Sequence, residues 1–325
     1  MSTKMPLVKA LNEGLRRTLE DHPKSLIQGE DVGKLGGVFR VTDGLQKDFG
    51  EDRVVDSPLA EAGIVGTAIG LAIRGWRPVC EIQFDGFVYP AFNEIVSQLA
   101  KMPYRSSGLV SLPVVIRIPY GGGIGAIEHH CESPEAYFCH TAGLRVVAPS
   151  TPNDAYWMIQ QAVSSDDPVI FMEPKVRYHT KGEVNFDAAP LPLHSAQVVR
   201  EGTDGTLIAY GAMVQVALDA AEAAAEDGRS LEVIDMRSLS PIDWPTLEAS
   251  ARKTGRVVVV HEASRSFSVS SEVAARLSEE CFYSLEAPVQ RVTGFDIPFP
   301  ASRHEDLFRP DLDRVLEAVD RSFDY

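Results

Sequence analysis

Short apolar runs alternate with helical patterns along the first half of the chain. Between residues 25 and 175 the segments that separate the runs repeat apolar residues at the spacing of a helix. The runs are "SLIQGEDV", "RPVCEIQF", "LPVVIRIP", "LRVVAPS" and "PVIFMEP". Valine- and isoleucine-rich strands separated by helices are typical of a mostly parallel sheet covered on both faces. This half is therefore predicted to be an α/β domain.

A second series of the same kind follows a break in the periodicity. Residues 181–196 carry prolines and polar residues in place of a regular apolar pattern, which predicts a linker. Beyond it, "GTLIAYGA", "SLEVIDMRSL" and "GRVVVVHEA" predict strands, and "VQVALDAAEAAAEDG" and "DLDRVLEAVDRSF" predict helices. We therefore expect two α/β domains, at residues 1–180 and 197–325.

Composition narrows the class of protein. With 44% hydrophobic and 24% charged residues, the 325-residue chain has the composition of a soluble globular protein. Four scattered cysteines do not make a disulfide framework. A formal net charge of −15 argues against binding to nucleic acid phosphates. No signal-peptide or membrane-spanning pattern is present, so a cytoplasmic location is expected.

The stretch "YGGGIGAIEHHCES", residues 120–133, carries the most conspicuous candidate chemistry. Its glycines satisfy the G-x-G-x-x-G/A pattern of dinucleotide-binding loops after a predicted strand. However, the next strand, "LRVVAPS", does not end in the acidic residue that holds the ribose. Each glycine also disfavours a helix by about 1 kcal/mol relative to alanine. A dinucleotide site is therefore disfavoured.

The residues after the glycines leave several alternatives open. His129, His130, Cys131, Cys139 and His140 are soft metal ligands, but they lack the paired spacing of structural zinc sites. A flexible connection without chemistry is one remaining interpretation. The other is a mobile loop that delivers a histidine for proton transfer near neutral pH.

A carboxylate in an apolar helix is the second candidate. In "VVDSPLAEAGIVGTAIGLAIRG", Ser57 is expected as N-cap and Pro58 as the first helical residue. Glu61 then lies one position beyond the capping-box place, so capping does not explain it. Residues 62–73 contain no charge, which predicts a helix buried on all sides, with glycines at positions where another backbone could approach. A carboxylate beside such a helix is either a favourable N-terminal charge or a functional group.

Long segments of the chain resemble one enzyme family. The segments are "GEDVGKLGGVFRVTDGL", "DSPLAEAGIVGTAIGLA", "EIQFDGFVYPAFNEIVSQLAKMPYRS", "GGGIGAIEHHCESPEAYFCHTAGLRVVAPSTPNDA", "DDPVIFMEPK" and "LEAPVQRVTGFDIPFP". In collinear order from about residue 5 to the C-terminus, the chain resembles the β subunit of the E1 component of 2-oxo acid dehydrogenase complexes. That thiamine-diphosphate family is related to transketolase. The resemblance implies a pyrimidine-binding domain followed by a transketolase-like C-terminal domain.

The resemblance also implies roles for single residues. Glu61 matches the glutamate that hydrogen-bonds the aminopyrimidine ring of thiamine diphosphate, Phe87 the aromatic residue that packs on that ring, and Leu59 a residue of the same pocket. His130, rather than its neighbour His129, matches the histidine that transfers protons near the substrate carbonyl and assists reductive acylation of a lipoyl group. Cys131 stands where the family usually has serine.

The resemblance implies partners as well. The chain has no Gly-Asp-Gly motif, which in thiamine enzymes holds Mg²⁺ and the diphosphate, so a separate α subunit should supply both in an α2β2 tetramer. A structural potassium ion would lie near Val114, Ala162 and Asp167. The C-terminal domain would dock the E2 acyltransferase. The acidic residues that would suit a basic partner, or else form an ordinary solvated surface, are Glu305, Asp306, Asp311 and Asp313.

The substrate is inferred from three segments that resemble branched-chain enzymes more than pyruvate enzymes: "HHCESPEAYF", "FMEPK" and "EECFYSLEAPVQRVTGFDIPFP". The implied reaction, a step of branched-chain amino acid catabolism, is oxidative decarboxylation of 3-methyl-2-oxobutanoate with acyl transfer to lipoamide on E2. Pyruvate and acetoin dehydrogenase β subunits are the alternatives. A non-catalytic scaffold subunit and a nicotinamide dehydrogenase built on the glycine loop are hypotheses of other classes.

Overall fold

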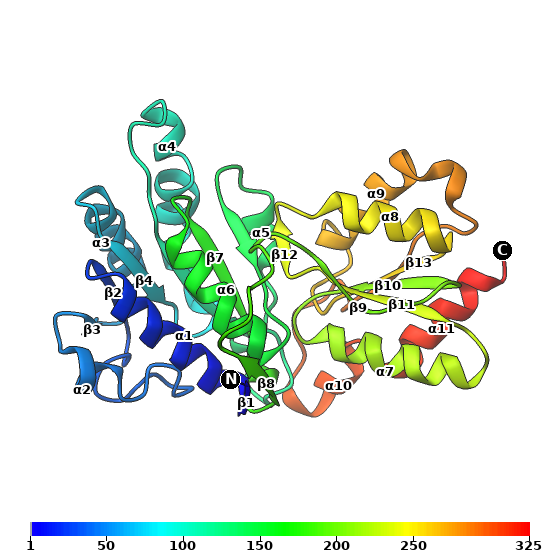
Figure 1. Ribbon diagram of the computed structural model, residues 1–325, viewed down its shortest axis with the longest axis horizontal. Helices are drawn as coiled ribbons and strands as arrows, with labels where there is room; N and C mark the ends of the chain where they lie inside the picture. Colours follow the sequence, from blue (N-terminus) through cyan, green and yellow to red (C-terminus); the bar gives the residue numbers. More distant parts are fainter. Residues whose placement is uncertain (1) are drawn as a thin grey trace. The chain divides into compact units, whose positions relative to one another are not determined.

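The computed structural model describes residues 2–325, which form two compact units (Figure 1). The first unit comprises the chain up to residue 120 together with residues 137–193, and the second comprises residues 121–136 and 194–325. The glycine-rich segment therefore groups with the second unit, although the sequence on both sides of it belongs to the first. No helix among residues 2–325 is both long and apolar enough to cross a membrane.

The first unit is built on a parallel sheet, as the apolar runs predict. Every neighbouring pair of its strands is parallel. In spatial order the strands are β6 (Arg145–Val147), β7 (Val169–Pro174), β5 (Val115–Tyr120), β4 (Arg77–Glu81), β2 (Ser25–Gly29) and β3 (Val54–Asp56). The central strands β2, β5 and β7 are buried along their whole length, which explains their continuous apolar sequences.

Helices α1 (Leu7–Asp21) and α6 (Pro152–Ser164) pack side by side in this unit and cover the sheet (Figure 1). Gly14 makes their close approach possible, because a Cβ there would lie 2.5 Å from Ile159 Cγ2. The other helical segments are α2 (Leu45–Phe49), α3 (Glu61–Ile73), η1 (Asp85–Ala91), η2 (Glu94–Leu99), α4 (Met102–Arg105), α5 (Glu135–Cys139) and η4 (Lys175–Arg177).

Residues 181–196 differ from the linker that the sequence predicts. Their first part is strand β8 (Lys181–Asn185), which pairs antiparallel with β1 (Ser2–Pro6). Val184 is the one residue of β8 that is buried. A strand with a single buried side chain has no apolar run to reveal it, so only its pairing with the distant N-terminus identifies it.

A buried ion cluster lies inside the first sheet. Arg117 on β5 bonds to Glu81 on β4 at 2.5 Å and to Glu173 on β7 at 2.6 Å. The Tyr178 hydroxyl donates to the same Glu173 carboxylate at 2.6 Å. Burial raises the pKa of Glu81, which Arg117 opposes, and burial together with Glu173 raises the pKa of Tyr178 well above its usual value. The Arg117 guanidinium therefore compensates two carboxylate charges whose burial would otherwise be strongly unfavourable.

The second unit has a smaller sheet with one antiparallel edge. In spatial order its strands are β14 (Gln290–Val292), β13 (Val257–Val260), β10 (Gly205–Ala209), β11 (Leu231–Asp235) and the antiparallel β9 (Gln197–Arg200). Figure 1 shows α7 (Met213–Glu226) and α11 (Leu312–Phe323) on one face, with α8 (Trp244–Thr254) and α9 (Val269–Glu280) on the other. The remaining elements are η3 (Glu128–His130), β12 (Ser238–Ser240), η5 (Phe282–Ser284), η6 (Ser302–His304) and α10 (Glu305–Phe308).

Candidate functional site

Glu61 opens helix α3, which follows β3 at the edge where the parallel strands end. Its side chain is buried, with 6% of its surface exposed. Within the described chain, residues 2–325, no group donates a hydrogen bond to the Glu61 carboxylate. A buried carboxylate without a donor is costly, and a bound molecule that supplies a donor would offset that cost. The residue therefore has the environment of a ligand-binding carboxylate.

Helix α3 begins later than the sequence predicts. Ser57 was expected as N-cap and Pro58 as the first helical residue, but the N-cap is Ala60 and the helix starts at Glu61. The prediction is wrong because the Ser57 N–H donates to the Gly29 carbonyl at 2.8 Å, which continues the contact between β3 and β2. Glu61 consequently lies in the first helical turn, where the helix dipole favours a negative charge.

A second carboxylate lies within electrostatic reach of Glu61. Glu30 directly follows β2 at the same edge of the sheet. Burial raises the pKa of Glu30, and the charges of Asp31 and Glu61 raise it further. Glu30 was not among the residues predicted from the sequence. The signal available was a carboxylate directly after an apolar strand, a position that lines ligand sites in parallel sheets.

Phe87 belongs to η1, which packs against α3. Its ring meets that of Phe84 edge-on, with 5.9 Å between the centroids. A fully buried ion pair between Lys175 and Asp85 fixes the start of η1 to the end of β7. Phe87 and Glu61 thus lie on neighbouring elements of one unit. Their shared role at the cofactor ring stays a prediction.

The outer face of α3 is open, contrary to the prediction that the helix is buried on all sides. Gly63, Gly66 and Gly70 are exposed, and a Cβ at Gly70 would meet no atom within 4 Å. Leu59, just before the helix, is 60% exposed. The prediction is wrong for this chain because α3 packs on the sheet along one face only. An exposed apolar helix face with small residues is typical of an interaction surface.

His130 ends the 3₁₀ turn η3 in the second unit. Its Nδ1 lies 3.1 Å from the carbonyl oxygen of His129, and the two imidazole rings are 4.6 Å apart at an angle of 66°. The side chain is half-buried. The predicted acid–base histidine is therefore carried by the second unit, whereas Glu61 is carried by the first.

The glycine loop holds carboxylates of its own unit. The N–H of Gly122 donates to Glu262, and the N–H groups of Gly123 and Gly125 each lie 3.1 Å from the carboxylate of Glu305. The loop leads into irregular structure and η3, with no helix beginning among the glycines. A dinucleotide loop needs that helix and free amide donors, so the structure agrees with the sequence in disfavouring a dinucleotide site.

Cys131 follows His130 and is fully buried, in an apolar cluster with Phe299, Phe308 and Ala126. A thiol behaves as a small hydrophobic group, so it suits this apolar cluster. Among residues 2–325, no three histidine, cysteine, aspartate or glutamate side chains come together as metal ligands. Residues 2–325 therefore contain no ligand set that would support the zinc alternative.

The three residues expected near a potassium ion lie in the first unit. The Val114 carbonyl accepts from Val169 N at 2.9 Å, and the Ala162 carbonyl accepts from Ser165 N at 3.2 Å. The Asp167 carboxylate pairs with Arg145 at 2.8 Å. Each of these residues thus has a protein partner. A carbonyl oxygen has a second lone pair, so the potassium site stays a prediction.

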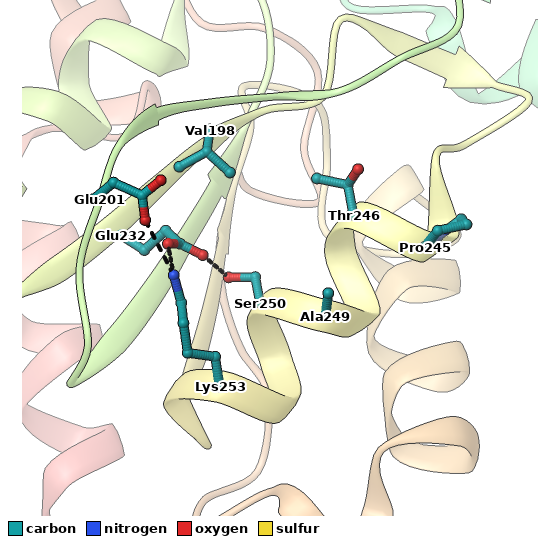
Figure 2. Close-up of a pocket in the computed structure, with 8 residues that line it drawn as sticks. All are labelled: Val198, Glu201, Glu232, Pro245, Thr246, Ala249, Ser250 and Lys253. Carbon is teal, nitrogen blue, oxygen red and sulfur yellow. Dashed lines mark hydrogen bonds and ion pairs between the residues drawn. The ribbon is translucent and has the colours of Figure 1, made fainter.

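A cavity of about 390 Å³ in the second unit contains none of the predicted site residues (Figure 2). It is lined by Val198, Glu201, Glu232, Pro245, Thr246, Ala249, Ser250 and Lys253. Figure 2 shows the Lys253 amine bound by Glu201 and Glu232. Burial alone would raise the pKa of Glu232, but hydrogen bonds from Lys253 and Ser250 outweigh it and lower that pKa. One ammonium group thus pairs with two carboxylates in this cavity.

Residues 3–181 match the transketolase pyrimidine binding domain, and residues 194–315 match the transketolase C-terminal domain. The pyruvate dehydrogenase E1 component subunit beta of Leifsonia xyli subsp. xyli is 67% identical over 99% of this chain and 95% of its own length. The 3-methyl-2-oxobutanoate dehydrogenase subunit beta of Mycobacterium tuberculosis is 52% identical over 98% of this chain and 91% of its own. A solved structure described as a split gene transketolase, inactive beta4 tetramer, superposes with a TM-score of 0.80 at 25% identity over 98% of both chains.

Proposed function

Because the chain belongs to the β-subunit family of the E1 component of 2-oxo acid dehydrogenases, we propose that it acts with a separate α subunit in oxidative decarboxylation of a 2-oxo acid. The pyrimidine-binding domain indicates thiamine diphosphate as the cofactor. The observation that carries the proposal is the buried Glu61 carboxylate, which has no hydrogen-bond donor among residues 2–325.

Glu61 would hold the aminopyrimidine ring. The helix dipole stabilises its negative charge, and exclusion of water strengthens a hydrogen bond made there. Phe87, whose helix packs against α3, would support the face of that ring, and Leu59 would line the same pocket. When bound, thiamine diphosphate supplies the electron sink for decarboxylation, while the protein supplies orientation and electrostatics.

His130 would move protons at the substrate carbonyl and during acyl transfer to a lipoyl group. A half-buried imidazole next to the His129 carbonyl has one ring nitrogen oriented by the backbone. An imidazole can both accept and donate a proton, which is what a general acid–base requires. The E2 component, which carries the lipoyl group, is the proposed acceptor of the acyl product.

The α subunit is proposed on two grounds. The chain lacks the Gly-Asp-Gly motif for Mg²⁺ and diphosphate, so a partner must supply both. The open glycine face of α3 offers a surface on which another backbone could pack closely. We propose an α2β2 tetramer in which this chain supplies the pyrimidine half of each site, with domains at residues 1–180 and 197–325. Potassium near Val114, Ala162 and Asp167 would be structural.

The substrate class is the finer part of the proposal. The three segments quoted above favour 3-methyl-2-oxobutanoate, and the 52% identical chains from Mycobacterium tuberculosis carry that name. Pyruvate is the second candidate, because the 67% identical chain from Leifsonia xyli is named for it. A pocket discriminates one methylene by only about 1–3 kcal/mol, so modest changes in pocket volume separate the two acids.

Co-expression with the candidate α subunit tests the proposal. Cofactor-dependent decarboxylation of 3-methyl-2-oxobutanoate and of pyruvate would be measured side by side, with the isolated chain as control. Activity of the assembled tetramer alone would support the split site, and the ratio of kcat/KM values would decide the substrate. A well-formed tetramer with no turnover of either acid would favour a non-catalytic scaffold subunit.

A further inference from the structure

The glycine loop is shaped to bind an anion. Gly121, Gly123 and Gly125 have φ values of 83°, 87° and 69°, in the left-handed region that favours glycine. Successive backbone turns of this kind direct N–H groups into one concavity, as in the nests that bind phosphate. In this protein the occupants are two carboxylates of the second unit, those of Glu262 and Glu305.

Glu262 forms the inner contact. It follows β13, is 5% exposed, accepts from the Gly122 N–H, and lies 3.4 Å from Nε of Arg309. There is no space for a side chain at Gly122, because a Cβ there would lie 2.3 Å from the ring of Phe299. This end of the loop is therefore fixed by close packing as well as by the carboxylate.

Glu305 forms the outer contact. It begins α10 and binds two amides at once, with Oε2 3.1 Å from Gly123 N and Oε1 3.1 Å from Gly125 N. Hydrogen bonds from N–H groups to a carboxylate are stronger than neutral ones. Glu305 is half-buried, so water can compete for both partners. This contact is therefore the one that a substitution would loosen first.

The rest of the segment is anchored on both sides of His130. The Gly121 N–H donates to the Glu132 carbonyl at 2.9 Å, which ties the two ends of the loop together. Cys131, next to His130, packs against Phe299 and Phe308 of the second unit. The Tyr210 hydroxyl donates to Glu135 at 2.6 Å. His130 thus belongs to a loop that two carboxylates hold. Glu262 is buried, and Glu305 is half-buried.

We propose that Glu305 is a positioning residue that holds the glycine loop and so places His130 for acyl transfer. This inference rests on the role proposed for His130. It also changes the interpretation of the acidic C-terminal residues: Glu305 serves the loop, and Asp311 caps α11 through Arg314 N at 2.9 Å. The neighbouring Asp306 is exposed and makes no hydrogen bond or ion pair with the loop in the described chain, residues 2–325.

The test uses the assembled α/β enzyme with four variants: Glu305→Ala, Glu305→Gln, His130→Ala and the matched control Asp306→Asn. Three quantities would be measured. They are amide hydrogen exchange of residues 121–130, reductive acylation of a lipoyl domain, and decarboxylation with an artificial electron acceptor.

We expect Glu305→Ala to speed exchange across the loop and to lower kcat/KM for reductive acylation about tenfold or more, because a charge-assisted clamp is lost. Artificial-acceptor decarboxylation should fall much less. Glu305→Gln keeps one acceptor oxygen and should lie between Glu305→Ala and the wild type. Asp306→Asn should match the wild type in loop exchange and in artificial-acceptor decarboxylation, neither of which involves E2.

Three results would overturn the inference. Unchanged exchange in Glu305→Ala would show that the carboxylate does not hold the loop. Full reductive acylation by Glu305→Ala, in a series where His130→Ala loses it, would show that the loop needs no clamp. If His130→Ala itself kept full reductive acylation, the proposed role of His130 would fail, and the positioning role of Glu305 would fail with it.

Discussion

Substitution of Glu61 by glutamine should separate function from stability. The carboxylate is 6% exposed and receives no hydrogen bond from residues 2–325, so glutamine removes no internal bond. What it removes is a buried negative charge in the first turn of α3, together with its repulsion of Glu30. The fold should therefore tolerate the change, while any chemistry that depends on the carboxylate should not.

The sizes of the two effects follow from these contacts. Loss of the favourable helix-dipole interaction costs about 0.3–1 kcal/mol. Removal of an uncompensated buried charge acts in the opposite direction. The net change in the free energy of unfolding should thus stay within about 1 kcal/mol, or a Tm change of no more than about 4 °C for domains of this size. Loss of the carboxylate that would hydrogen-bond the cofactor's aminopyrimidine ring should lower kcat by about 10² to 10⁴-fold, equivalent to about 3–5 kcal/mol in the barrier.

The assay is kcat of the reconstituted tetramer at saturating cofactor, with thermal unfolding of the same preparation. Glu272→Gln is the matched control, since Glu272 is exposed in the first turn of α9. It should change neither quantity beyond about 0.5 kcal/mol. A Glu61→Gln enzyme that kept more than about a tenth of wild-type kcat would refute the catalytic role. A loss of stability above about 2 kcal/mol would show instead that Glu61 is a structural residue.

Four further predictions concern the first unit. Arg117→Met leaves two carboxylates buried and should cost about 3–5 kcal/mol of unfolding free energy in a denaturant titration. Arg145→Met, at an exposed pair, should cost no more than about 1 kcal/mol. The pKa of Glu30 is raised in the folded state above the ordinary glutamate value of 4.5. The contribution of Glu30 to wild-type stability should therefore fall as the pH rises from about 4.5 toward neutrality. Glu30→Gln should reduce that slope and be more stable than the wild type at pH 7, which unfolding curves at several pH values would check. Gly14→Ala should lower stability by about 1–3 kcal/mol, because its Cβ would meet Ile159, and an unchanged Tm would contradict the packing of α1 on α6.

The local pattern of the sequence determined the first sheet and singled out Glu61 as a candidate. The apolar runs of β2, β5 and β7 predicted a parallel sheet because such strands are buried on both faces. Glu61 stood out because a carboxylate that no capping motif explains precedes an uncharged helix. These features depend on neighbours within a few residues, which is the range over which periodicity and capping act.

Only the tertiary structure decided where the glycine loop belongs and what occupies it. Gly123 and Glu305 are 182 positions apart, and Gly122 and Glu262 are 140 apart. The glycines match a dinucleotide-binding pattern that the rest of the sequence disfavours, but a nest of N–H groups has the same local sequence whichever anion fills it, so the glycines could not reveal the two carboxylates. The open face of α3 was likewise hidden, since its apolar sequence does not reveal which face packs on the sheet. Contacts between distant segments depend on how the elements pack in three dimensions. Local hydrophobic periodicity carries no information about that packing.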